Sequence, residues 1–494
     1  MHPEMLPVII QGGMGVGISS WMLANAVAAG GQLGVVSGTA LDTSFVRRLN
    51  DGDPGGHYRR AMAAFPMQDF VAEVMEKYFR PEGREGAPYT PLKLFTMTLD
   101  RERARLLALA NFAEVFLARE GHSGQVGINF LTKIQLPNLP SLYGAMLAGV
   151  NYVLMGAGIP RDIPGALDRM ARHEPASMHI DVTGADGSAD ETYKFDPRSL
   201  WDEEPTEITR PAFLPIIASN SLATMMAKKA SGRIDGFIVE GPTAGGHNAP
   251  PRGPKQLNER GEPIYGERDV VDLQKLGELG LPFWVAGGAG SPERLQEARA
   301  QGAAGIQVGT LFAYAEESGL RPDLKARVIR QALEGKADVF TDDRASPTGF
   351  PFKVVTLEGS ISEAAVYEQR ERVCDLGYLR TPFRREDGKI RFRCASEPVD
   401  TYLKKGGALE DTAGRKCLCN ALMANLGLGQ VRDSAAGEEL PLLTSGDDLV
   451  NLGRFLRGRT SYSAADVLDY LLAAPVGAAA TPVVPGAEAS KPIP

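Results

Sequence analysis

The chain has 494 residues, of which 43% are hydrophobic and 23% charged, and its formal net charge is −8. It has no basic stripe, no apolar run of about 18 residues and no basic segment ahead of an apolar one, which argues against nucleic-acid binding, a membrane span and a secretory signal. We therefore expect a cytoplasmic protein, long enough for one large barrel with an appendage.

The first 38 residues predict a βαβ unit, which favours a parallel sheet. A strand over residues 7–11 is followed by six residues that include four glycines. Ser19 or Ser20 then caps a helix that ends near Ala29, and a second strand covers residues 33–36. The glycines do not match a dinucleotide-binding fingerprint, because their spacing differs and no acidic residue ends the second strand.

Residues 41–124 have the amphipathic pattern of helices, predicted over residues 57–65, 67–79 and 100–119. This stretch is too long for a simple crossover between barrel strands. We interpret it as an inserted helical lid or dimerisation element and expect a homo-oligomer.

Strands and helices alternate regularly from residue 125 to residue 310. The predicted strands cover residues 125–131, 151–155, 213–219, 234–240, 282–286 and 305–308. Residues 177–182 resemble a further strand, and residues 183–211 form a polar insertion. If residues 177–182 belong to that insertion, the whole chain has eight strands, which predicts an α/β fold of the (β/α)8 TIM-barrel class.

The strand at residues 234–240 leads into Glu240-Gly-Pro-Thr-Ala-Gly-Gly-His247. Gly245 and Gly246 let the backbone approach a flat ligand. The neutral imidazole of His247 can accept a proton near pH 7, and barrel enzymes place such groups where a strand ends. We predict that His247 is a general base; a glycine turn with a surface histidine is the alternative.

Two further strands end in Gly287-Gly288 and in Gly309-Thr310. In barrels, the loops after the seventh and eighth strands commonly bind phosphate through backbone N–H groups, which glycines expose. Thr310 adds a hydroxyl donor. Tight turns that simply require glycine are the alternative, but two such ends in succession favour a phosphate site.

These motifs, together with Pro7-Val-Ile-Ile-Gln-Gly-Gly-Met14, resemble the nitronate monooxygenase family over about residues 5–320. That resemblance implies a TIM barrel with non-covalently bound FMN and makes His247 the active-site histidine. It implies that the backbone near Gly13 and Met14 lies along the isoalloxazine ring and that Gly287, Gly288, Gly309 and Thr310 hold the phosphate. The other residues that we expect at the cofactor are Gly12, Asn129, Glu240, Gly245 and Gly246.

Two departures from the family pattern set this chain apart. Thr243 stands where the family usually has glutamate, and Gly12-Gly13 stands where it often has Ala-Pro. With the two insertions, these features resemble a longer branch of FMN-dependent enoyl reductases found with polyunsaturated fatty-acid and polyketide synthases.

After residue 320 the barrel pattern stops. We predict a C-terminal helical region over residues 321–472, with helices at 325–333 and 361–378 and polar turns at 341–355, followed by a disordered tail over residues 473–494. All four cysteines lie in this region: Cys374, Cys394, Cys417 and Cys419. Clustered thiols in a cytosolic chain suggest a metal site, and soft sulfur ligands select an iron–sulfur cluster or zinc. Four ordinary buried cysteines are the alternative.

The predicted function is that of an FMN-dependent oxidoreductase acting on a substrate with an acidic C–H or a conjugated carbonyl. A trans-acting enoyl reductase of fatty-acid or polyketide biosynthesis is one alternative, and a barrel lyase or aldolase with a phosphate-bearing substrate is another. The lyase needs a Schiff-base lysine, for which Lys133 is the nearest candidate. A non-catalytic flavin-binding role also stays open. The expected partners are a small-molecule or acyl-carrier-bound substrate and an NAD(P)H or electron-transfer partner.

Overall fold

The computed structural model describes residues 6–98, 100–184, 191–203, 205–432 and 437–474. Eight parallel strands form its central sheet in the order β1-β10-β9-β8-β7-β4-β3-β2. Their bounds are β1 Ile9–Gln11, β2 Gly34–Ser37, β3 Val126–Leu131, β4 Tyr152–Gly156, β7 Ala212–Ile217, β8 Phe237–Glu240, β9 Phe283–Ala286 and β10 Gly305–Val308. The amide of Gln11 donates to Leu33 O at 3.0 Å, which joins the two edge strands. The predicted TIM barrel is confirmed.

Apolar side chains from alternate strand positions fill the barrel interior, as the period of two along a strand requires. They are Ile10, Leu33, Val35, Tyr152, Leu154, Leu214, Ile238, Trp284 and Ala286. The indole N–H of Trp284 donates to Pro7 O at 2.8 Å, so the largest of these side chains keeps its polar atom satisfied.

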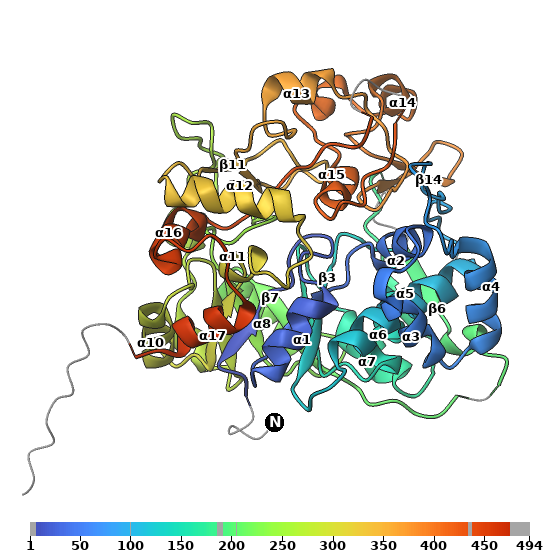
Figure 1. Ribbon diagram of the computed structural model, residues 1–494, viewed down its shortest axis with the longest axis horizontal. Helices are drawn as coiled ribbons and strands as arrows, with labels where there is room; N and C mark the ends of the chain where they lie inside the picture. The colour runs from blue at the N-terminus through green and yellow to red at the C-terminus, as the bar shows by residue number, and fades with distance from the viewer. Residues whose placement is uncertain (1–5, 99, 185–190, 204, 433–436, 475–494) are drawn as a thin grey trace, which may run out of the picture.

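Helices surround the barrel in the predicted order (Figure 1). They are α1 Trp21–Ala29, α6 Asn138–Leu147, α7 Ile163–Met170, α8 Asn220–Lys229, α9 Leu273–Gly277 and α10 Pro292–Ala300. Ser20, Ser219 and Ser291 cap α1, α8 and α10 with their hydroxyl oxygens. The outer layer is completed from the far end of the chain, because α17 Ala464–Leu472 packs against α1 and α10.

The first insertion contains the three predicted helices, α3 His57–Ala63, α4 Gln68–Tyr78 and α5 Arg101–Ala118. It also contains a helix that was not predicted, α2 Leu41–Asn50, and the 3₁₀ turn η2 Pro54–Gly56. Helix α5 is buried along almost its whole length and packs on α6 and α1. It therefore occupies the crossover position between β2 and β3, which is a place in the barrel wall rather than in a lid.

The second insertion has more structure than its polar sequence suggests. β5 Ala176–His179 pairs antiparallel with β6 Thr192–Phe195, and the turn η3 Pro197–Leu200 follows. Residues 177–182 thus belong largely to the insertion, which leaves the barrel with eight strands.

The C-terminal region lies over one end of the barrel (Figure 1). A short helix, α11 Thr310–Ala313, follows β10. The elements of the C-terminal region are α12 Pro322–Leu333, β11 Val339–Asp342, β12 Phe352–Val355, α13 Ala364–Gln369, β13 Thr381–Arg384, β14 Ile390–Arg393, α14 Val399–Lys404, η5 Leu409–Thr412, α15 Leu418–Ala424, η6 Asp447–Asn451 and α16 Leu452–Leu456. Two predictions were wrong here. Residues 341–355 contain most of the antiparallel β11–β12 pair, and residues 361–378 are helical only in α13. Residues 475–494, most of the predicted tail, lie outside the described residues.

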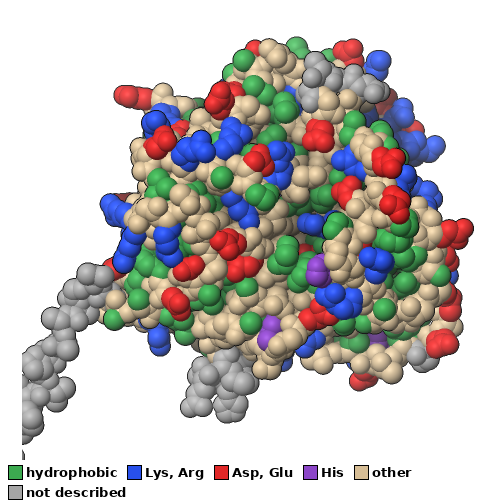
Figure 2. Space-filling view, in the orientation of Figure 1, with side chains coloured by type: hydrophobic (Ala, Val, Ile, Leu, Met, Phe, Trp, Pro, Cys, Tyr) green, Lys and Arg blue, Asp and Glu red, His purple; other side chains and the backbone are tan. Residues whose placement is uncertain are grey.

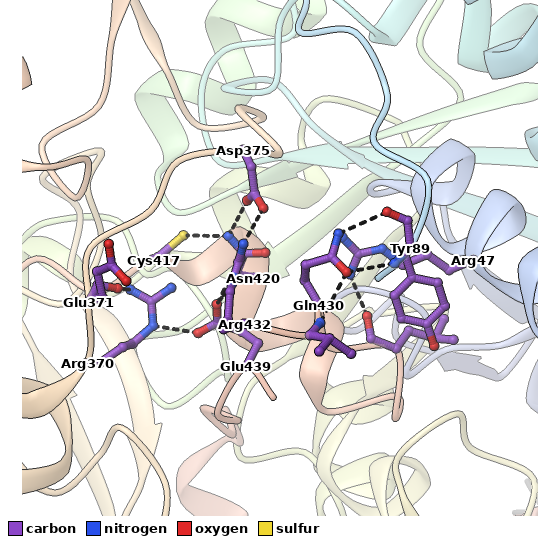
Figure 3. Close-up of polar contacts among 12 residues, drawn as sticks. Arg47, Tyr89, Arg370, Glu371, Asp375, Cys417, Asn420, Gln430, Arg432 and Glu439 are labelled. Atoms are coloured by element: carbon purple, nitrogen blue, oxygen red, sulfur yellow. Dashed lines mark hydrogen bonds and ion pairs between the residues drawn. The ribbon is translucent and has the colours of Figure 1, made fainter. Parts of the chain in front are cut away.

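A buried ion-pair network holds the C-terminal region together (Figure 3). Glu439 accepts from Arg370 Nε at 2.5 Å and from Arg432 Nη2 at 3.1 Å. Arg432 also pairs with Asp375 at 2.7 Å. The side chain of Glu439 is only 3% exposed, so its charge is compensated by these two guanidinium groups and not by water.

Among the described residues, no helix combines the length and the apolar character needed to cross a membrane.

Candidate active site

One large cavity lies at the carboxyl ends of the barrel strands, the edge where barrels carry their active sites. Every residue that we predicted for the histidine and cofactor site lines this cavity. They are Gly12, Gly13, Met14, Asn129, Glu240, Gly245, Gly246, His247, Gly287, Gly288, Gly309 and Thr310. The structure thus brings them together, while their individual roles stay predictions.

Loop residues after β1 form one wall of the cavity. A Cβ on Gly13 would lie 2.2 Å from Cβ of Asn129, so only glycine lets this loop pass the end of β3. Asn129 Nδ2 donates to Gly13 O at 3.4 Å, and the Ser19 hydroxyl accepts from the amide of Met14 at 2.8 Å. These contacts fix a stretch of bare backbone beside the cavity.

The loops after β9 and β10 form the end predicted to bind phosphate. Gly287 and Gly288 have φ values of 84° and 64°, which glycine adopts without strain. No hydrogen-bond partner is found among the described residues for the amides of Gly287, Gly288, Gly309 and Thr310. Four unpaired backbone donors at one end of a cavity make an anion site.

His247 lies beside the cavity, enclosed by residues from the C-terminal region. Its ring packs edge-on against Phe352 with centroids 4.9 Å apart, and its Nε2 lies 2.7 Å from Ser346 Oγ. Burial, with a smaller contribution from the charge of Lys133, lowers the pKa of His247 to about 3. The imidazole is therefore neutral at pH 7 and can accept a proton.

Glu240 ends β8 and faces the same cavity. Burial raises the pKa of its carboxyl to about 7. A carboxyl that is part protonated near neutral pH can donate a hydrogen bond as well as accept one.

Four segments of the C-terminal region cover the cavity. They are residues 346–353, 374–379, 418–422 and 444–448, and together we call them the cover. They contribute the lining residues Phe352, Tyr378, Leu379, Leu418, Cys419, Leu422, Thr444, Ser445, Gly446 and Asp448. Except for Cys419, none of them was predicted. No local pattern marks them, because they come from loops, short helices and the start of β12, whose places are set by distant contacts.

The cover packs directly on the histidine loop. A Cβ on Gly245 would lie 2.8 Å from the backbone of Ser445 and Gly446. Gly245 therefore makes room for the cover, and not only for a flat ligand as the sequence suggested. Lys353 N also donates to Gly246 O at 2.9 Å, which ties β12 to the same loop.

The predicted metal centre at Cys374, Cys394, Cys417 and Cys419 is not supported. Among the described residues, which include all four cysteines, no group of three or more His, Cys, Asp or Glu side chains is arranged to hold a metal ion. Ser396 Oγ lies 3.2 Å from Cys394 Sγ, and Asn420 Nδ2 donates to Cys417 Sγ at 3.5 Å. Burial raises the pKa of Cys417 and of Cys419, which keeps both as thiols.

Lys133, the candidate Schiff-base residue, does not line the large cavity. It borders a small neighbouring crevice with Tyr378 and Arg380, and its Nζ donates to Thr348 Oγ1 at 3.3 Å. Burial lowers the pKa of Lys133 to about 6. Among the described residues, no lysine lines the cavity, so the lyase alternative lacks its Schiff-base residue.

Comparison with known proteins agrees with the motifs. Residues 203–341 match the family model described as nitronate monooxygenase. That stretch includes His247 and both glycine-containing ends at 287–288 and 309–310. The resemblance to this family is confirmed. No curated protein sequence matches the chain.

Three solved structures are among those similar to this chain. FabK from Thermotoga maritima is 17% identical, with 72% of each chain covered and a TM-score of 0.40. A nitroalkane oxidase from Streptomyces ansochromogenes is 15% identical, with 95% of this chain and 96% of that chain covered and a TM-score of 0.41. The enoyl reductase domain of MlnA from Bacillus amyloliquefaciens is 11% identical, with 94% and 92% covered and a TM-score of 0.44. Similarity this low gives no information about substrate.

Proposed function

We propose that the protein is an FMN-dependent oxidoreductase acting on a substrate with an acidic C–H or a conjugated carbonyl. One observation carries the proposal: unpaired backbone amides, bare backbone and a neutral histidine line a single cavity at the carboxyl ends of the strands. The amides suit a phosphate, the bare backbone suits a flat ring, and the histidine suits proton transfer.

The residues present fit FMN. The amides of Gly287, Gly288, Gly309 and Thr310 would hold its phosphate, and the loop at Gly12, Gly13 and Met14 would lie along its ring. A side chain at Gly309 would crowd the site, since its Cβ would lie 3.3 Å from Met14 Sδ. When bound, the flavin would supply the electron transfer.

The protein's own residues would bind, orient and shield the substrate. His247 would exchange a proton with the substrate at Nδ1, because its Nε2 is already engaged with Ser346. The cover would exclude water from the cavity, which strengthens the electrostatic interactions inside it. Glu240 would bind a polar group of the cofactor or the substrate through its partly protonated carboxyl.

A trans-acting enoyl reductase is the second candidate, and the apolar character of the cover favours it. Leu379, Leu418 and Leu422 line the cavity together with Phe352. Such a surface would accept an alkyl chain, including one carried on a pantetheine arm, more readily than a small nitro compound. Thr243, which replaces the family's usual glutamate, is a further difference from the monooxygenase pattern.

Cofactor release followed by a substrate comparison tests these proposals. Heat-released cofactor should chromatograph as FMN; FAD, or no flavin in freshly purified protein, would refute the first proposal. Holoenzyme under anaerobic conditions should then be tested with a nitroalkane alone, and with an enoyl thioester plus NADH or NADPH. Flavin reduction by the nitroalkane supports a monooxygenase, whereas NAD(P)H oxidation that depends on the enoyl thioester supports a reductase.

A further inference from the structure

A chain of side-chain hydrogen bonds leads from His247 to a half-buried lysine. Ser346 Oγ lies 2.7 Å from His247 Nε2 and 2.8 Å from Thr348 Oγ1. Thr348 Oγ1 in turn accepts from Lys133 Nζ at 3.3 Å. We call the four residues His247, Ser346, Thr348 and Lys133 the hydroxyl relay.

The two hydroxyl residues are held firmly in place. Ser346 is fully buried, its Oγ accepts from the amide of Thr348 at 3.2 Å, and its carbonyl accepts from Arg415 at 2.7 Å. His247 is fixed from the other side by a backbone bridge to Phe352. Both hydroxyls lie beyond residue 341, where the family match ends, so this part of the relay comes from the cover.

Lys133 makes no other side-chain hydrogen bond or ion pair with the residues that the structure describes. Its Nζ lies against the ring of Phe350. Burial lowers the pKa of Lys133 to about 6, so the ammonium and the neutral amine are both populated near neutral pH.

We propose that Ser346 and Thr348 connect Lys133 to His247 as a proton relay, and that the charge state of Lys133 selects which nitrogen of the imidazole carries the proton. The inference rests on the proposed function in one respect, namely that His247 exchanges a proton with the substrate. Lys133, Ser346 and Thr348 act through His247 and are therefore positioning residues.

The selection follows from counting donors. An ammonium can only donate, so a charged Lys133 donates to Thr348, and each hydroxyl has one hydrogen to pass on. Thr348 then donates to Ser346, Ser346 donates to Nε2 of His247, and the ring proton sits on Nδ1. His247 in this state presents a proton donor to the cavity.

The neutral amine permits the opposite direction. His247 Nε2–H then donates to Ser346, Ser346 to Thr348 and Thr348 to the lone pair of Lys133. Nδ1, for which no partner is found among the described residues, then carries the lone pair and can act as a base. A proton accepted there releases the Nε2 proton to Ser346; each hydroxyl passes one proton on, and Lys133 becomes the ammonium.

Other charged or titratable groups surround the relay. Arg415 contacts the carbonyl of Ser346, Arg380 and Tyr378 border the crevice beside Lys133, and Glu240 faces the shared cavity. Arginine keeps its charge throughout, and burial raises the pKa of Tyr378 well above its usual value. Glu240, whose pKa burial raises to about 7, is the one that titrates in the same range as Lys133, so Glu240→Gln serves as a background variant.

Ring-nitrogen NMR of the full-length protein with ¹⁵N-labelled histidine tests the relay. The chain has six histidines, and the signals of His247 are assigned by their loss in His247→Gln. In the wild type and in Glu240→Gln, the neutral ring should change from the Nδ1–H to the Nε2–H tautomer as pH rises through about 6, the pKa of Lys133. Lys133→Arg, which keeps its charge, should hold the Nδ1–H form at every pH.

Thr348→Val and Thr348→Ser form a matched pair, because only serine keeps the hydroxyl. The pH-dependent exchange of tautomers should vanish in Thr348→Val and persist in Thr348→Ser. A single tautomer at all pH values in the wild type, or an exchange that survives in both Thr348→Val and Lys133→Arg, would overturn the proposal. The measurement needs neither flavin nor substrate, so its outcome is independent of the cofactor-release test.

Discussion

The barrel and the cover line the same cavity, but different kinds of interaction hold them in place. The barrel contributes strand ends, whose positions are set by a backbone ladder and by an apolar interior. The cover contributes four segments made of loops, short helices and the start of β12, held by side-chain networks such as that around Glu439 (Figure 3). The barrel offers backbone amides and His247, whereas the cover offers apolar side chains and hydroxyls. The barrel thus suits cofactor binding, and the cover suits control of water and of the histidine.

Replacing His247 should separate chemistry from cofactor binding most sharply. In His247→Ala, flavin reduction by the true substrate should slow by roughly 10²- to 10⁴-fold, about 3–5 kcal/mol of barrier, because the base is lost. FMN should stay bound, since the proposed phosphate amides are untouched. Stopped-flow absorbance of the flavin measures the rate, and dithionite reduction should be unchanged.

His179→Ala is the matched control, because the side chain of His179 is 44% exposed and lies in the second insertion. The flavin of this variant should be reduced at the wild-type rate. Loss of flavin from His247→Ala alone would make His247 a structural residue and would remove the division between barrel and cover.

Breaking the ion-pair network should loosen the cover and leave the barrel intact. Glu439→Gln leaves Arg370 and Arg432 without their shared anion, and removal of one partner from a buried pair typically costs about 3–5 kcal/mol. The free energy of unfolding of the C-terminal region in urea should fall by this amount. Hydrogen exchange should quicken in residues 370–380 and 418–432 but not in the barrel strands.

Glu438→Gln changes the exposed neighbour and should alter neither measurement. Uniformly faster exchange in the barrel strands of Glu439→Gln would show instead that the barrel and the cover unfold as one unit.

The same contrast explains what the sequence could reveal. Strand ends such as Gly245–His247 and Gly287–Gly288 were predictable, because an apolar run followed by glycine is a local signal. The eight-strand barrel followed from the same alternation. The pairing of Ser346 with His247 was not predictable, since 99 residues separate them and neither lies in a motif that indicates the other.

Long-range contacts also overrode local propensity in the C-terminal region. Residues 361–378 have a helical pattern, yet α13 stops at Gln369. The next side chains are drawn to distant partners: Arg370 to Glu439, and Arg372 to the carbonyls of Ala395 and Thr412. The cysteines misled for the related reason that clustering in sequence does not fix how the sulfur atoms are arranged.

A side chain at the proposed phosphate site should weaken FMN binding by an intermediate amount. Gly288 has a φ of 64°, and its Cβ would lie 3.3 Å from Thr243 Oγ1. Gly288→Val should shift the loop and misalign its amides, at a cost of about 1.5–3 kcal/mol for one charge-assisted hydrogen bond, or roughly 10- to 100-fold in FMN affinity. Gly280→Val introduces a similar strain at a φ of 70° with no neighbour within 4 Å. This control should bind FMN normally; equal losses in both variants would mean that strain, and not the phosphate contact, sets the affinity.

The smallest effect is expected where the cover itself meets the phosphate end. Asp448 lines the cavity, and its Oδ2 accepts from the amide of Gly290 at 3.2 Å. Burial raises the pKa of Asp448, although that amide opposes the shift, and a nearby phosphate would disfavour the carboxylate further. Asp448→Asn keeps the acceptor and removes the charge, so FMN should bind more tightly by about 1 kcal/mol, or roughly fivefold. FMN affinity is measured by titration of the apoprotein, followed by flavin fluorescence. Glu293→Gln, which changes an exposed acid in the first turn of α10, should leave that affinity unchanged. Weaker binding in Asp448→Asn would instead show that Asp448 helps to bind the cofactor. Cofactor binding would then be shared by the cover and the barrel.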